Sequence, residues 1–352
     1  MHNINKLYDT NHIMNTLGID VHATRVFFVE NFSQLIKAWH ESIIYELPIL
    51  ILGEGSNVVF LEDYRGIVIF NRLKGISITE QKDYWHLHVR AGEYWQYLVE
   101  LTLKKGIFGL ENLAFIPGYV GAAPIQNIGA YGVEFADFCE YVEIFDLNRK
   151  KKIILSANEC NFGYRDSIFK HTYKNHHVIT AVGLIIKKKW YPNINHDSLV
   201  NLNSKITAQD ILNIIWNIRT SKLPNTNIFG NAGSFFKNPI IDIKQARTLL
   251  LAFPNIPYYQ HDDNKIKLSA GWLIEKCNLK GYLLGGAAVH SEHALILINK
   301  NKATGLDIAL LADKIRQDVG KKFNIWLEPE VRFFKSNGEI NFNLIKSIIE
   351  KK

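Results

Sequence analysis

The sequence predicts a mixed protein in which an α+β region precedes a smaller α/β domain. Two patterns support this. Short β-branched and aromatic runs dominate the chain before Thr207, whereas amphipathic helical patterns alternate with short strands after it. At 352 residues the chain is also longer than a domain with a single hydrophobic core usually is, so two or three domains are expected.

Each element is predicted from its own pattern and its own start or stop residues. Gly106 should end the one helix of the first region. Thr207, with Asp210 three residues later, should cap the first helix of the second region, and Pro224 lies beyond its end. The expected strands lie at 47–53, on both sides of a turn at Arg65-Gly66, at 85–92, in a hairpin at 141–156, at 177–190 and at 293–299. The expected helices lie at 93–106, 207–224, 243–253, 269–281 and 304–320.

The composition restricts the possible functions. An apolar share of 47% and a charged share of 21% are those of a globular protein. The net charge of +7 is mildly basic, but there is no arginine cluster, and Lys187–Lys189 is the densest positive run. Nucleic-acid binding is therefore not expected, whereas small anionic ligands suit this balance.

Cysteine usage and hydropathy indicate the compartment. Cys139, Cys160 and Cys277 are scattered, odd in number and without metal-ligand spacing, so we expect a reducing compartment and no metal site. Residues 1–20 are polar and lack the apolar core of a signal peptide. No apolar run reaches the roughly 18–20 residues of a membrane helix. A cytoplasmic protein without membrane contact is expected.

Two segments favour an anionic, planar ligand. Gly53 and Gly55 follow a strand, but β-branched residues and not a helix come next, which excludes a Rossmann fingerprint. An anion-binding nest of backbone N–H groups and an ordinary tight turn both remain open. Residues 109–134 are rich in Gly and Ala, apolar and almost uncharged. Such a segment either lets a flat ligand approach the backbone closely or forms a buried crossover.

The segment GNAGSFFKNP, residues 230–239, places a serine after two glycines and before two phenylalanines. Taken alone it predicts a turn that runs into a buried strand. No G-x-S-x-G motif surrounds Ser234, which disfavours hydrolase chemistry.

Seven segments occur together in the chain. In sequence and in order, they closely resemble the UDP-N-acetylenolpyruvoylglucosamine reductase family, whose members are also called UDP-N-acetylmuramate dehydrogenases. The resemblance covers about residues 20 to 335, and the insertion at 190–202 is similar to that of the longer branch. The segments are 52–60, 109–134, 162–170, 230–239, 270–281, 285–290 and 327–334.

The resemblance implies an FAD-binding fold of the vanillyl-alcohol oxidase type, with two subdomains, followed by a C-terminal α/β substrate-binding domain. Subdomain 1 would combine residues 1–72 and 326–352, subdomain 2 would span 73–221, and the substrate domain 222–325. It also implies non-covalent FAD, NADPH as co-substrate, and a monomer. The substrate would be UDP-N-acetylglucosamine enolpyruvate, an intermediate of peptidoglycan precursor synthesis.

The family reaction passes hydride from NADPH to FAD, and then from flavin N5 to C3 of the enolpyruvyl ether. Negative charge then develops at C2 and on the neighbouring carboxylate. By resemblance, Arg165 stabilises that charge through its fork of N–H donors. Glu330 would help to stabilise the same charge when protonated, because it can then donate a hydrogen bond. The nearby Glu328 is a less favoured candidate for this role. Ser234 would protonate C2, since a weak but well-placed acid suffices for a carbanion.

The resemblance assigns binding roles to further residues. His196 and His293 depart from the family, which has a substrate-closing tyrosine and a glutamine at these positions. Arg219 would hold a substrate or flavin phosphate, and Lys237 would hydrogen-bond near the serine. The cofactor residues would be Gly53, Gly55, Ser56, Asn57, Pro117, Gly121, Ala122, Gly129 and Arg332. The substrate residues would be Tyr164, Lys222, Asn238, His196 and His293.

Two other functions use the same fold. A flavoprotein oxidase would act on an alcohol and would reoxidise rapidly in oxygen. A flavin-retaining binding protein would hold FAD without oxidising NADPH. The segments around Arg165, Ser234 and Glu330 favour the reductase over both.

Overall fold

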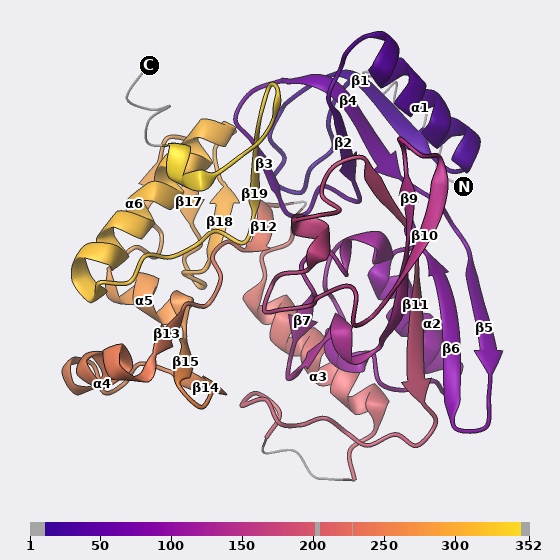
Figure 1. Cartoon of the computed structure of the whole chain (residues 1–352). Helices are drawn as coiled ribbons and strands as arrows, with labels where there is room; N and C mark the ends of the chain where they lie inside the picture. The colour runs from indigo at the N-terminus through magenta and orange to yellow at the C-terminus, as the bar shows by residue number, and fades with distance from the viewer. Residues whose placement is uncertain (1–10, 201–204, 227, 346–352) are drawn as a thin grey trace. The chain divides into compact units, whose positions relative to one another are not determined.

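The computed structural model describes residues 11–200, 205–226 and 228–345 (Figure 1). These residues form two compact units. Unit 1 combines the described residues of 1–24, 55–65 and 222–352; unit 2 combines 25–54 and 66–221. The division into three domains expected above stays a prediction.

Parts of two predicted segments lie outside the described residues. They are the first ten residues of the polar N-terminal segment and the last two of the insertion at 190–202. Among the helices that are described, none combines the length and the apolar character needed to cross a membrane.

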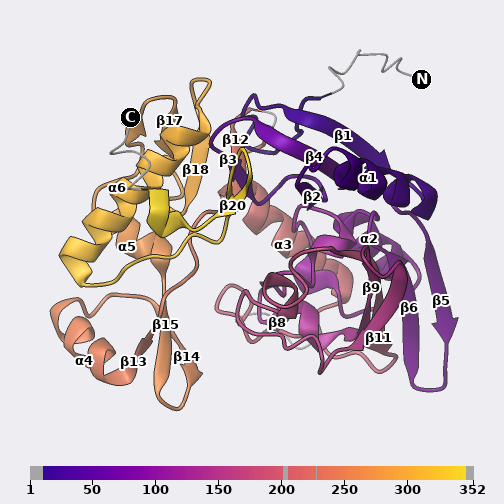
Figure 2. The same ribbon diagram turned by 45° about the horizontal axis from the view of Figure 1, so that its top comes forward.

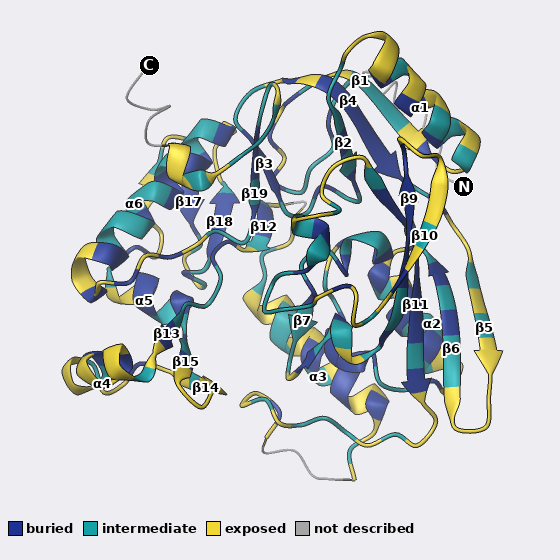
Figure 3. Ribbon diagram, viewed as in Figure 1, coloured by how far each residue is buried: buried dark blue, intermediate teal, exposed yellow. Residues whose placement is uncertain are grey.

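Unit 2 is built on a five-stranded antiparallel sheet in the order β10-β9-β11-β6-β5. The central strand β11 is buried along nearly its whole length, because elements cover both faces, whereas β5 is an exposed edge (Figure 3). The helices α2 (Trp95–Lys104) and α3 (Ala208–Lys222) contribute buried residues to the same core. The strands are β5 (Ile76–Glu80), β6 (Tyr84–Arg90), β9 (Cys139–Asp146), β10 (Lys151–Ser156) and β11 (His177–Lys187).

A second, three-stranded sheet has the order β1-β4-β2, and its strands are β1 (Ala23–Val29), β2 (Ile49–Leu52) and β4 (Tyr64–Asn71). Helix α1 (Phe32–Ile44) packs Leu35 and Ala38 into a core with Ile67 and Ile69 of β4. The side chain of Asn31 caps this helix by accepting from the Gln34 N–H at 3.0 Å. The sequence analysis did not predict α1.

The segment 109–138, which includes residues 109–134, is irregular, and most of its residues are buried or half-buried. Its elements are η1 (Glu111–Leu113), η2 (Val120–Ala122), β7 (Gly129–Ala130), β8 (Val133–Glu134) and η3 (Phe135–Asp137). Buried amide side chains replace the missing backbone ladder. Asn112 Nδ2 donates to the Tyr131 carbonyl at 2.8 Å, and Asn127 Nδ2 donates to the Gly163 carbonyl at 3.1 Å. These bonds fix the loop without regular structure.

Unit 1 contains a four-stranded sheet, β12-β18-β17-β16, and helix α6 (Gly305–Phe323) contacts three of these strands. Both ribbon views show α6 running alongside β17 and β18 (Figure 2). The strands are β12 (Gly230–Ser234), β16 (Leu283–Leu284), β17 (Ala287–Val289) and β18 (Ile296–Asn299).

Two smaller three-stranded sheets complete unit 1. In one of them, β19 pairs in parallel with β3, which comes from the first quarter of the chain. The other is β13-β15-β14, with α4 beside β13 and β15, and α5 contacts α6. The elements are β3 (Val58–Phe60), β13 (Ile240–Asp242), α4 (Ile243–Ala252), β14 (Tyr258–Asp262), β15 (Lys265–Leu268), α5 (Ala270–Lys276), β19 (Arg332–Lys335) and β20 (Gly338–Ile340).

Two sequence predictions were wrong. The turn predicted at Arg65-Gly66 lies inside β4, because the Arg65 N–H donates to the Ser336 carbonyl at 2.7 Å and holds the chain extended. Strands β3 and β4 also join different sheets and form no hairpin. Residues 230–234, predicted as a turn, form strand β12, because it pairs with β18 and is interrupted only by a bulge.

Helix α6 offers a stability test of a predicted helix start. Thr304 and Asp307 form a capping box: the Asp307 N–H donates to Thr304 Oγ1 at 3.1 Å, and the Thr304 N–H donates to Asp307 Oδ2 at 2.8 Å. Thr304→Ala should lower the free energy of unfolding by about 1 kcal/mol in chemical denaturation. Thr220→Ala, at an exposed threonine that bonds only its own helix, should cost less.

Candidate active site

Ser234 is the last residue of β12, and its side chain is exposed. The pairing of β12 with β18 shifts register between Asn231 and Ser234, and Gly233 has a φ of +68° at this bulge. The two rings that follow, Phe235 and Phe236, are fully buried, as predicted. A bulge turns a side chain away from the regular alternation of a strand. The buried rings therefore anchor a short segment that presents an exposed hydroxyl.

Glu330 lies on the segment that pairs with this one. The Glu330 N–H donates to the Phe235 carbonyl at 2.8 Å, and Phe236 and Pro329 form an antiparallel bridge. The Lys237 N–H donates to the Glu328 carbonyl at 2.9 Å. Unit 1 thus brings together Ser234 and Glu330, two residues that are almost 100 positions apart in the sequence.

Asn57 and Arg332 join the same region of unit 1. Asn57 Nδ2 donates to the Glu330 carbonyl at 3.2 Å, and the Arg332 N–H donates to the Asn57 carbonyl at 3.1 Å. The Arg332 guanidinium forms an ion pair with Glu339 at 2.6 Å and lies 5.0 Å from the centroid of the Phe334 ring. Two predicted cofactor residues therefore adjoin the segment that carries Glu330.

Three neighbouring polar side chains contact other residues of unit 1. The Lys237 ammonium group forms an ion pair with Glu328 at 3.4 Å, and 76% of the Glu328 side chain is exposed. Asn238 Oδ1 accepts from the Ala270 N–H at 3.0 Å, at the start of α5. These contacts give Lys237 and Asn238 structural partners within unit 1, and their predicted contacts with substrate stay predictions.

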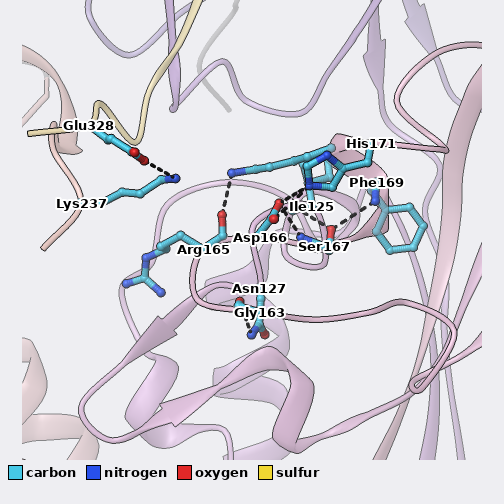
Figure 4. A network of polar contacts seen from close by, with 11 residues as sticks. Ile125, Asn127, Gly163, Arg165, Asp166, Ser167, Phe169, His171, Lys237 and Glu328 are labelled. Atoms are coloured by element: carbon cyan, nitrogen blue, oxygen red, sulfur yellow. Dashed lines mark hydrogen bonds and ion pairs between the residues drawn. The ribbon is translucent and has the colours of Figure 1, made fainter. Parts of the chain in front are cut away.

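Arg165 belongs to unit 2 and lies in a tight turn. The N–H groups of Gly163 and Asp166 donate to each other's carbonyls at 3.0 and 3.2 Å, and Arg165 has a φ of +55°. Lys170 Nζ donates to the Arg165 carbonyl at 2.7 Å, while Asp166 bonds His171 (Figure 4). A non-glycine residue with positive φ is held there by surrounding bonds. The turn therefore fixes where the arginine side chain starts.

The guanidinium group of Arg165 reaches the loop predicted to surround the flavin ring. Arg165 Nη2 donates to the Gly129 carbonyl at 2.8 Å, and the guanidinium carbon lies 5.5 Å from the centroid of the Tyr164 ring. A Cβ atom on Gly129 would lie 3.1 Å from Arg165 Nη1 and 2.9 Å from Glu134 Cγ. Glycine at position 129 therefore leaves the space that the guanidinium occupies.

The predicted cofactor loops contain positions that only glycine fits. Gly55 has a φ of +73°, and a Cβ atom there would lie 2.4 Å from the Met14 carbonyl oxygen. A Cβ atom on Gly121 would lie 2.5 Å from Ala91 Cβ. Burial raises the pKa of Glu54, an effect partly offset by a hydrogen bond from the Gly118 backbone. In unit 2 this bond links the chain at Glu54 to the loop at 117–122.

A buried cation in unit 2 fits an anionic cofactor. Among the described residues, Arg219 Nε is buried and has no hydrogen-bond partner. Burial lowers the pKa of Arg219, while Tyr131 acts in the opposite direction through charge and a hydrogen bond. A buried guanidinium with an unused donor is a favourable partner for a phosphate group. The donor set is thus consistent with the phosphates of FAD.

Tyr131 is a residue that the sequence analysis missed. Its ring contacts His196 edge-on, with centroids 5.2 Å apart, and its hydroxyl bonds Arg219. His196, Arg219 and Tyr131 are therefore neighbours within unit 2. The available signal was a tyrosine placed directly between two small residues, Ala130 and Gly132.

Comparison with known proteins decides the family. A profile described as the UDP-N-acetylenolpyruvoylglucosamine reductase C-terminal domain matches residues 223–334, and a profile described as an FAD binding domain matches 23–149. The UDP-N-acetylenolpyruvoylglucosamine reductase of Salmonella typhimurium is 53% identical over 328 residues, covering 93% of this chain and 96% of that protein. The chain belongs to the UDP-N-acetylenolpyruvoylglucosamine reductase family.

Two other members of the reductase family also align with nearly the whole chain. The enzyme of Escherichia coli K12 is 52% identical over the same share of both chains. The crystal structure of the UDP-N-acetylenolpyruvylglucosamine reductase from Thermus caldophilus aligns with a TM-score of 0.62 at 25% identity, covering 92% of this chain and 98% of that one. The predicted FAD-binding domain and the reductase family's C-terminal domain are confirmed. The vanillyl-alcohol oxidase type of the fold stays a prediction. The protein is an FAD-dependent oxidoreductase of peptidoglycan precursor synthesis.

Gly55→Ala tests the predicted pyrophosphate loop of this reductase. The added methyl group would meet the Met14 carbonyl at a strained φ, so the loop must move. We expect the Kd for FAD, measured by quenching of flavin fluorescence, to rise at least about tenfold. Gly106→Ala is the matched control, because Gly106 has a φ of +74° but open space around it. That variant should lose stability and keep its affinity for FAD; equal losses of affinity in both would contradict the assignment.

Proposed function

We propose that this protein uses NADPH to reduce the enolpyruvyl group of UDP-N-acetylglucosamine enolpyruvate, forming UDP-N-acetylmuramate. The observation that carries the proposal is the pairing of residues 235–237 with 328–330, which holds Ser234 and Glu330 on neighbouring segments of unit 1. Membership in the reductase family gives the substrate class. When bound, FAD would supply from N5 the hydride that adds to C3 of the enolpyruvyl ether.

Ser234 is the proposed proton donor to C2. Hydride addition at C3 leaves a strong base at C2, so a hydroxyl of ordinary acidity suffices if it is well placed. The bulge at Gly233 exposes the hydroxyl, and the buried rings of Phe235 and Phe236 hold its position. The chemistry needs a fixed donor more than an acidic one.

Arg165 and Glu330 are the proposed stabilisers of the charge that develops on the substrate carboxylate. Arg165, in unit 2, offers permanently charged donors whose orientation is fixed by the Gly129 carbonyl and by the surrounding turn. Glu330, in unit 1, would act in its protonated form as a hydrogen-bond donor. Fixed donors aimed at developing charge cost little reorganisation during the reaction.

The chain's own residues would hold the two nucleotide ligands. Gly53, Gly55, Ser56 and Asn57 are proposed to bind the FAD pyrophosphate, and Arg219 to bind a phosphate. Pro117, Gly121, Ala122 and Gly129 would surround the flavin ring, with Arg332 nearby. Tyr164, His196, Lys222, Asn238 and His293 are the proposed substrate residues. We also propose a cytoplasmic, monomeric enzyme; light scattering coupled to gel filtration tests the second point.

An anaerobic absorbance experiment tests the function. NADPH should bleach the flavin bands of the purified protein, and the enolpyruvyl UDP-sugar should then restore them. Bands that bleach but do not return with the sugar would contradict the proposed substrate. Rapid reoxidation by oxygen alone, without turnover of the sugar, would favour an oxidase. Bound flavin that NADPH cannot reduce would indicate a binding protein.

A further inference from the structure

The turn that carries Arg165 is tied to one neighbouring loop of unit 2 on both of its sides (Figure 4). On the side that precedes the arginine, Asn127 Nδ2 donates to the Gly163 carbonyl at 3.1 Å. On the side that follows it, Ser167 Oγ donates to the Ile125 carbonyl at 2.7 Å. Two side-chain bonds therefore hold the two ends of the turn on the same loop.

The same loop also orients the guanidinium group. Arg165 Nη2 donates to the Gly129 carbonyl at 2.8 Å. The three loop residues that bond this segment, Ile125, Asn127 and Gly129, are alternate residues of the chain. The backbone and the side chain of Arg165 are thus positioned against one short stretch, so that a shift of the turn on this stretch would also shift the guanidinium.

Ser167 is buried, with 1% of its surface exposed, and its hydroxyl is used in both directions. It donates its only proton to the Ile125 carbonyl, and it accepts from the Phe169 N–H at 3.3 Å. The second bond caps the short helix η4 (Ile168–Lys170), and Phe169 belongs to the main core of unit 2. The hydroxyl therefore links the arginine turn to a rigid part of the unit and has no proton left for a chemical step.

We propose that Ser167 is a positioning residue for Arg165, and that reduction of the enolpyruvyl group depends on its hydroxyl. This inference rests on the proposed function, in which Arg165 stabilises charge on the substrate carboxylate. Arg165 has a φ of +55°, a strained conformation that persists only where surrounding bonds enforce it. Without the bond from Ser167 to Ile125 the turn can relax, and the guanidinium moves with it. A displacement of about 1 Å in a catalytic group can cost about 10²-fold in rate.

Ser167→Ala should slow reoxidation of the reduced flavin by the enolpyruvyl UDP-sugar about 10–100-fold. Reduction of the flavin by NADPH and the Kd for FAD should change by less than about twofold, because Arg165 acts only on the substrate carboxylate. Stopped-flow absorbance measures the two half-reactions, and quenching of flavin fluorescence measures the Kd. Ser42→Ala is the matched control, since Ser42 is also buried in unit 2 and donates to the Trp39 carbonyl at 2.8 Å within α1. It should keep both rates.

A double-mutant cycle separates positioning from general damage. Arg165→Ala alone should slow reoxidation by about 10²–10³-fold, the usual cost of losing a donor to a developing anion. Adding Ser167→Ala should slow it further by less than about threefold, because two residues that act through one group are not additive. Ser167→Thr keeps the hydroxyl, and the extended backbone at residue 167, with φ −165° and ψ 170°, suits a β-branched side chain. This variant should recover the rate to within about fivefold of the unsubstituted enzyme.

The outcomes distinguish this inference from the proposed function. Normal reoxidation of Ser167→Ala, or the full effect of Ser167→Ala on top of Arg165→Ala, would overturn the inference and leave the proposed function standing. Equal damage to both half-reactions in Ser167→Ala would show a general structural role and would also overturn it. If the enolpyruvyl UDP-sugar does not reoxidise the flavin of the unsubstituted protein, the proposed function is wrong, and the inference with it.

Discussion

Ser234→Ala should slow reoxidation of the reduced flavin by the enolpyruvyl UDP-sugar about 10³-fold, while NADPH still bleaches the flavin at the normal rate. The substitution removes only the proton donor to C2. It leaves in place the bulge at Gly233 and the buried ring of Phe235 that anchors the segment. Stopped-flow absorbance of the two half-reactions, recorded separately, measures both rates.

The control for this variant is Ser77→Ala, at an exposed serine on the edge strand β5 of unit 2. Both half-reactions should keep their normal rates in it. Normal reoxidation of Ser234→Ala by substrate would remove this serine from the mechanism. Loss of both half-reactions would show a structural role for the β12 bulge.

Glu330→Gln should reduce the rate of the second half-reaction by about 10²–10³-fold, the usual cost of losing one donor to a developing anion. The amide keeps the size of the side chain, and the backbone bonds of residue 330 to Phe235 and Asn57 do not involve it. Stopped-flow rates across a pH series compare this variant with the unsubstituted enzyme.

Glu328 offers a matched control two residues away. Its carboxylate is exposed and forms an ion pair with Lys237 at 3.4 Å, so Glu328→Gln should change either rate by less than about twofold. If Glu328→Gln were the slower variant, the assignment of Glu330 would be wrong. Equal damage to both half-reactions in Glu330→Gln would indicate a structural role.

Helices with clear ends were the elements that local sequence predicted well. Helix α2 stops before Gly106, and α3 begins after Thr207, whose hydroxyl accepts from the Asp210 N–H at 3.2 Å. Strand partners were not predictable in the same way. Nothing local to Val58–Phe60 indicates that it pairs with β19, and Arg65-Gly66 has turn composition but lies in a strand. Tertiary pairing overrides local propensity in such segments.

The site was predictable as a set of residues but not as a geometry. The ordered segments identified Arg165, Ser234 and Glu330, because those motifs are specific to one family. The bulge at Gly233 and the positive φ of Arg165 depend on hydrogen bonds from distant segments, which no local pattern encodes. Tyr131 was missed for the same reason, since its importance arises from the neighbours that folding gives it.

The parallel pairing of β3 with β19 has a consequence for synthesis of the chain. Phe60 leaves the ribosome about 270 residues before Arg332, a wait of roughly 15–50 s at ordinary elongation rates. Strand β3 must remain unpaired during that time, whereas the last residue of unit 2, Ser221, is made more than 100 residues earlier. Ribosome-bound chains that end before Arg332 should therefore show protease-resistant unit 2 and protease-sensitive unit 1.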